Sequence, residues 1–134
     1  MILDRGNVVV EFAAIVVAAM LPVAYLGSAC WDVARTQLAL RTAAHAASRA
    51  YVLSGTLQTA QRRAASVVAV SLADAGVSAA GVRRIVSCSQ SPCLTPGGYV
   101  TVRLAASVRV AVPVAGSVAV SISAADTSVV DVHR

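Results

Sequence analysis

A run of 23 residues near the start of the chain, from Asn7 to Ala29, holds one charged residue and is otherwise mostly Val, Ala, Ile, Leu and Met. At about 1.5 Å per residue, a helix of this length spans the roughly 30 Å hydrocarbon core of a bilayer. A secretory signal peptide normally has a net positive start and a shorter apolar stretch. Here Asp4 offsets the charge of Arg5, so we predict a retained transmembrane segment over residues 7–30.

The single charge in this run is Glu11. A charged side chain within an apolar transmembrane helix costs about 2.5–3.5 kcal/mol on insertion scales, so such a residue commonly marks a function or a specific partner. The alternative interpretation is that the carboxylate simply reaches the lipid headgroups near the helix end. Basic residues are enriched on the cytoplasmic side of a membrane span. Asp4 offsets Arg5 before the span, whereas Arg35 and Arg41 follow it, so this rule does not predict that the C-terminal part lies outside the cell.

The residues around Glu11 form a longer pattern. Gly6 stands five residues before Glu11, at the border of a charged leader and an apolar helix, and this is similar to the cleavage motif of type IV prepilins. The run Arg5-Gly6-Asn7-Val8-Val9-Val10-Glu11-Phe12-Ala13, followed by Pro22, resembles the signature of TadE-like minor pilins of tight-adherence pili. The Ala- and Val-rich composition, with Arg as the basic residue throughout, is typical of a GC-rich genome such as an actinobacterial one.

The resemblance implies a structural role. A prepilin peptidase would cut between Gly6 and Asn7, so that residues 1–6 are a leader. Glu11 and Phe12 would lie in the assembly region, and the Glu11 carboxylate would pair with the amino terminus of a neighbouring subunit, offsetting two buried charges. The implied partners are the peptidase, other pilin subunits, the tight-adherence assembly machinery and membrane lipid. The head, residues 31–134, would be extracytoplasmic.

Two other classes of protein remain open from the sequence. One is a single-span accessory protein of a secretion or envelope complex, which would not be cut after Gly6. The other is a tethered surface-binding or adhesin module, with a saturable surface on its sheet around Arg103 and Arg109. The tether could also be lipid, because Leu26-Gly27-Ser28-Ala29-Cys30 is similar to a lipoprotein cleavage site.

The fold class expected is α+β. A helix continues to about Leu53 as an amphipathic stretch, and a second helix covers about Leu57 to Ala75, with Gly76 as its stop. The expected buried positions of the first are Val33, Leu40, Ala44, Ala47 and Tyr51, with Asp32, Arg35, Arg41, His45, Ser48 and Arg49 mainly off that stripe. Those of the second are Leu57, Ala60, Ala64, Val67, Val68 and Leu72.

An antiparallel sheet of three or four strands should follow. Strict alternation from Tyr99 to Val112 predicts a long strand whose even-numbered residues face the core. The other expected strands are Val82–Cys88, Ser117–Ala125 and a short one including Val130 and Val132, with a turn at 113–116.

Cys88 and Cys93 flank a turn-like loop, and a disulfide between them suits an oxidising compartment. The alternative is a metal site, but these cysteines with the distant His45 and His133 do not form a recognisable zinc set. We expect no metal and no cofactor.

The sequence also argues against two functions. Neither histidine has a nucleophile and a carboxylate in a known catalytic order, and no Gly-rich phosphate loop is present, so we expect no enzyme and no catalytic residues. The arginines, including the Arg62-Arg63 pair, lack interleaved aromatic residues, so we expect no nucleic-acid binding.

Overall fold

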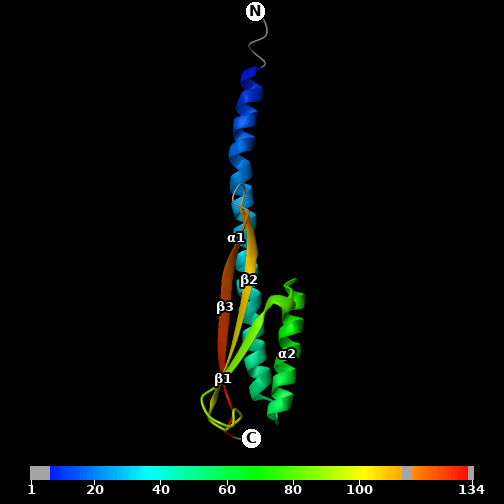
Figure 1. Cartoon of the computed structure of the whole chain (residues 1–134), viewed down its shortest axis with the longest axis vertical. Coiled ribbons are helices and arrows are strands. Elements are labelled where there is room, and N and C mark those ends of the chain that lie inside the picture. The colour runs from blue at the N-terminus through cyan, green and yellow to red at the C-terminus, as the bar shows by residue number, and fades with distance from the viewer. Residues whose placement is uncertain (1–6, 113–115, 133–134) are drawn as a thin grey trace, which may run out of the picture. The chain divides into compact units, whose positions relative to one another are not determined.

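The computed structural model describes residues 7–112 and 116–132. Its elements, in chain order, are α1 (Asn7–Val52), α2 (Leu57–Asp74), the short 3-10 helix η1 (Ala79–Gly81), β1 (Arg83–Cys88), β2 (Tyr99–Val112) and β3 (Gly116–Val129) (Figure 1). This α+β layout of a long N-terminal helix, a second helix and a small antiparallel sheet confirms the predicted fold class. The chain divides into two compact units, Met1–Asp32 and Val33–Arg134.

The helical core of the second unit follows the predicted stripes. On α1, Leu40, Ala44 and Ala47 are fully buried, and on α2 the buried residues are Ala60, Ala64, Val68 and Leu72. Two expectations are wrong. Leu57 is exposed, because it stands at the first turn of α2. Ser48, predicted to lie mainly off the stripe, is fully buried, because its hydroxyl forms hydrogen bonds with Asp126 and Ser128 of β3.

Local signals set the ends of α2. The side chain of Thr56 accepts a hydrogen bond from the Thr59 amide at 3.3 Å, which supplies a partner for a free amide of the first turn. At the other end, Gly76 has a φ of 68°, a left-handed conformation that favours glycine. The amide of Val77 bonds to the Leu72 carbonyl and that of Gly76 to the Ala73 carbonyl, the two bonds of a Schellman motif. The predicted stop at Gly76 is confirmed.

The three strands are antiparallel in the order β1-β2-β3, and β2 has the predicted bounds. β3 continues four residues beyond the predicted end at Ala125, to Val129. The predicted separate last strand does not occur in the described part of the chain: Val130 lies just after β3 and exchanges backbone hydrogen bonds with Gly97 and Gly98. Of the predicted turn, residues 113–115 lie outside the described residues, and Gly116 opens β3.

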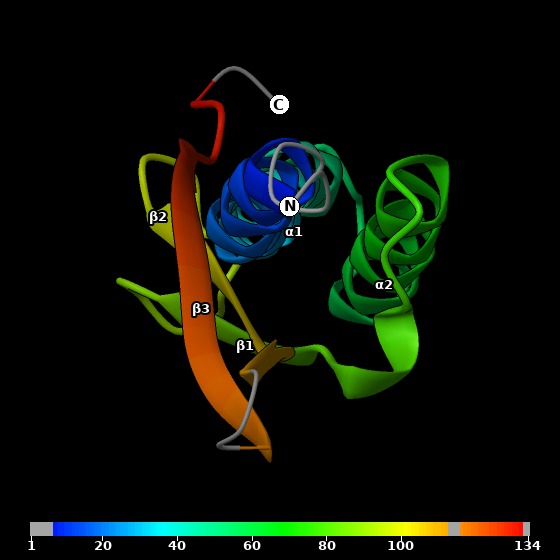
Figure 2. The same cartoon turned by 90° about the horizontal axis from the view of Figure 1, so that it is seen from above.

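One face of the sheet makes the core. Val100, Val102 and Leu104 of β2 are fully buried and join the cluster that contains the buried residues of α2 and of the Val33–Val52 part of α1. Seen from above, the curved sheet has both helices of this unit on the same side (Figure 2). Burial decreases along β2, and Val112 at its end is 36% exposed.

β3 is an edge strand of the sheet. An edge strand carries backbone groups without a neighbouring strand and can pair with another chain. Here the side-chain amide of Gln37, on α1, donates to the backbone carbonyl of Ser123 at 3.3 Å. A backbone group of the edge strand therefore has a partner within the chain.

Candidate functional site

The described part of the first unit is the beginning of α1, and its surface is apolar. Ten large apolar side chains between Val8 and Leu26 each expose 57% to 70% of their surface to solvent. Of the helices in the described residues, α1 is the one that is long and apolar enough to cross a membrane. Transferring such surface from water to an apolar environment is favourable at about 25 cal/mol per Å². Burial of this part of α1 in an apolar environment is therefore favourable.

Glu11 and Phe12 lie within this surface, and both side chains are exposed. Residues three or four positions apart are neighbours on a helix, so Glu11 is flanked by Val8, Ala14 and Ile15. Within the described ranges the Glu11 carboxylate has no ion-pair partner. The site combines one carboxylate with an apolar wall, which suits a cationic partner brought by another molecule.

The two residues of the predicted cleavage site fall at the limit of the described chain. Gly6 lies outside the described residues, and Asn7 is the first residue of α1. Farther along, α1 remains helical through Pro22. Because proline lacks an N–H, the helical bond to the carbonyl four residues earlier is absent at that point.

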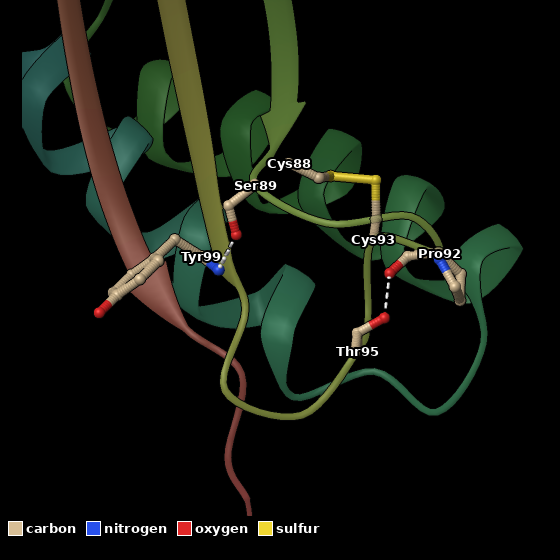
Figure 3. The surroundings of a disulfide bond; sticks show 6 residues. All are labelled: Cys88, Ser89, Pro92, Cys93, Thr95 and Tyr99. Carbon is tan, nitrogen blue, oxygen red and sulfur yellow. Dashed lines mark hydrogen bonds between the residues drawn. A yellow bond between two sulfur atoms is a disulfide. The ribbon is translucent and has the colours of Figure 1, made fainter.

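Cys88 and Cys93 form the predicted disulfide, which closes the loop after β1 (Figure 3). The same loop is held by two further bonds: the Tyr99 amide donates to the Ser89 hydroxyl at 2.8 Å, and the Thr95 hydroxyl donates to the Pro92 carbonyl at 2.6 Å (Figure 3). Cys30, the third cysteine, is exposed on α1 and has no disulfide partner in the described chain.

A polar cluster that the sequence did not predict joins α1 to β3. The Ser48 hydroxyl lies 2.5 Å from one carboxylate oxygen of Asp126 and 2.8 Å from the Ser128 hydroxyl. The other carboxylate oxygen of Asp126 lies 3.3 Å from Nδ1 of His45. The signal was present in the sequence: Asp126 and Ser128 continue the core-facing register of Ile122 and Ala124, and a polar residue at such a position requires a polar partner.

The geometry of this cluster differs from that of a Ser-His-Asp triad. In a triad the imidazole lies between the hydroxyl and the carboxylate, so that it can take the hydroxyl proton. Here the carboxylate of Asp126 lies between Ser48 and His45, and Ser48 is fully buried. The cluster is thus suited to holding β3 against α1. Two open hollows of about 420 and 480 Å³ flank His45 along this seam.

Tyr51, near the end of α1, is 1% exposed and packs in the core. Burial raises the pKa of its hydroxyl above the ordinary 10.0, because the ionised form would lose its hydration, and the positive charge of Arg84 partly opposes this shift. Arg84 also donates to the backbone carbonyl of Gln61 at 3.2 Å, which ties β1 to α2.

Among the described residues, no three His, Cys, Asp or Glu side chains lie together as metal ligands would. No protein-family model matches the chain, and no curated protein or solved structure is significantly similar to it. The candidate site therefore has to be interpreted from its own chemistry.

Proposed function

We propose that this chain is a membrane-anchored, non-enzymatic structural subunit, a minor pilin or pseudopilin similar to the TadE-like proteins of tight-adherence pili. The observation that carries the proposal is the apolar surface of α1, where ten large apolar side chains from Val8 to Leu26 are at least 57% exposed around the single charge of Glu11. In this proposal the apolar surface is covered first by lipid and then by the helices of neighbouring subunits.

Glu11 sets the register of assembly in this proposal. After cleavage between Gly6 and Asn7, the new amino terminus is an ammonium group. An ammonium from one subunit and the Glu11 carboxylate of the next offset each other, and removing one partner of such a buried pair costs about 3–5 kcal/mol. A subunit shifted by one helical turn leaves both charges unpaired, so the pairing selects one register.

The direct test of processing is the N-terminal sequence and intact mass of the protein purified from its native envelope. A chain that begins at Asn7 supports prepilin-type cleavage. An intact leader of residues 1–6 would contradict it and favour a single-span accessory protein. A lipid-modified Cys30 as the first residue would identify a surface lipoprotein instead.

The test of assembly is the pair of substitutions Glu11→Ala and Glu11→Gln, with Val10→Ala as the control at a neighbouring exposed position. Both Glu11 variants should be folded and membrane-inserted but should co-sediment with pilus or envelope assemblies at least tenfold less than the parent, because they lack the negative charge. Val10→Ala should assemble normally. Assembly of both Glu11 variants at the parental level would refute the role of the carboxylate.

A further inference from the structure

The face of the sheet that is turned away from the helices has a distinct composition. In the register of the three strands, Arg103 lies opposite Ile85 on β1 and Ala125 on β3, and all three are exposed. The same face contains Arg83, opposite Ala105, and Arg109, opposite Ala119. We call this surface, made of the odd-numbered residues of β1, β2 and β3, the outer face.

Its charge is of one sign. Arg83 and Arg103 are diagonal neighbours, which places the two residues about 7–8 Å apart. Arg109 follows Arg103 by six residues on the same strand, or about 20 Å at 3.4 Å per residue. No odd-numbered position of the described strands is Asp or Glu, and the one acidic residue of the strands, Asp126, faces the helices through its bond to Ser48. The three guanidinium groups thus have no carboxylate on their own face.

The remainder of the outer face is rich in hydroxyl groups. Ser107 and Ser121 form an exposed cross-strand pair, and the hydroxyls of Thr101 and Thr127 lie 2.7 Å apart. Near one end, Tyr99 is 54% exposed and provides an aromatic ring. Ile85 and Val129 are the other large apolar side chains exposed on this face. The face therefore combines fixed positive charge, many small hydrogen-bonding groups and one aromatic ring.

From this combination we infer that the outer face binds an acidic polysaccharide. Guanidinium groups form paired, charge-assisted hydrogen bonds with carboxylate or sulfate groups. Serine and threonine hydroxyls both donate and accept, as sugar hydroxyls do. A tyrosine ring offers an apolar surface for the C–H face of a sugar. An extended strand surface, about 20 Å between Arg103 and Arg109, suits an extended polymer with repeating negative groups.

Two other polyanions fit the face less well. A single-stranded nucleic acid binds through aromatic rings on which successive bases stack, whereas the outer face of the described strands has Tyr99 alone. An anionic membrane favours basic residues flanked by a continuous apolar surface that enters the headgroup region. Here the exposed apolar side chains of the outer face do not form a continuous surface. Ile85 lies opposite Arg103, and the Ser87, Thr101 and Thr127 row separates it from Tyr99 and Val129. The inference is independent of the pilin assignment, because it needs neither cleavage nor assembly.

The test uses the full-length protein in nonionic detergent micelles, with binding to immobilised polygalacturonate and heparin measured by biolayer interferometry. Arg83→Gln/Arg103→Gln removes two charges from the outer face. Arg62→Gln/Arg63→Gln removes two charges from exposed positions of α2 and is the matched control. We expect the outer-face variant to lose about tenfold or more in affinity, as expected for two charge-assisted contacts, and the control to change by less than about twofold.

Each alternative result has a definite meaning. Absence of binding to both acidic polymers, or equal losses in the two double variants, would overturn the inference, since the second result indicates attraction by net charge alone. Tighter binding to single-stranded DNA or to phosphatidylglycerol vesicles than to either polysaccharide would also overturn it and would identify the respective partner class. Neutral dextran should not bind.

Discussion

The buried bond between Ser48 and Asp126 should matter more to stability than the ion pair between His45 and Asp126. The Ser48 hydroxyl carries one proton, and the charged Asp126 oxygen at 2.5 Å is a stronger acceptor than the His45 carbonyl at 2.9 Å. Ser48 is fully buried, so a hydrogen bond to a charged group is worth about 1.5–3 kcal/mol there.

The other interaction of Asp126 is weaker. The side chains of His45 and Asp126 are 61% and 30% exposed, so water screens their attraction, and the pair is worth at most about 0.5 kcal/mol. We therefore predict that Ser48→Ala lowers the free energy of unfolding by about 2 kcal/mol and His45→Ala by less than about 0.5 kcal/mol. For a domain of this size, the loss in Ser48→Ala corresponds to a fall in Tm of about 10 °C.

The assay is hydrogen exchange by mass spectrometry on the full-length protein in detergent, following peptides from β2 and β3. The opening free energy of these peptides reports the attachment of the sheet to α1. Asp126→Ala and Ser48→Ala/Asp126→Ala complete a double-mutant cycle, in which a coupling of about 1–2 kcal/mol is expected for groups in contact. If His45→Ala destabilises the sheet as much as Ser48→Ala does, the ranking by burial is refuted.

Three further predictions concern the second unit. Leu72→Ala should cost about 2–5 kcal/mol because Leu72 is fully buried, whereas Leu38→Ala, at a site 67% exposed, should cost less than about 0.5 kcal/mol; urea unfolding compares them. The raised pKa of Tyr51 means that its contribution to stability is complete below the ordinary value of 10.0 and is lost as the pH rises through the folded-state pKa. Tyr51→Phe should therefore lose less stability than the parent between neutral pH and pH 11, and equal losses would contradict this reasoning. Opening the Cys88–Cys93 loop with Cys93→Ser should cost about 2 kcal/mol, as loop-closure entropy predicts, and an unchanged Tm would argue against it.

The sequence predicted the fold where side-chain periodicity was strong. β2 was predicted with both ends correct because its even-numbered residues are apolar throughout. β3 was predicted four residues short because its core-facing positions become polar at Asp126 and Ser128, which interrupts the apolar alternation. Asp126 and Ser128 remain in the strand because their side chains form hydrogen bonds with the Ser48 hydroxyl on α1.

Of the candidate site, the sequence predicted Glu11 but not the polar cluster of Ser48, Asp126 and His45. Glu11 stands out in sequence because one charge interrupts a long apolar run, and the exposed apolar helix agrees with that local pattern. The contact between His45 and Asp126 joins residues 81 positions apart, which neither periodicity nor motif spacing reveals. Contacts of this kind depend on which elements pack together, and one sequence alone does not define that pairing.

The bond from Gln37 to the Ser123 carbonyl has a consequence for contacts between copies of this chain. Between Gly116 and Ala125, β3 carries no charge and no proline, the usual deterrents to unwanted strand pairing. A copy that attempts to add its own strand at Ser123 must first displace the Gln37 amide. A single amide side chain thus opposes the addition of another strand at this point of the edge.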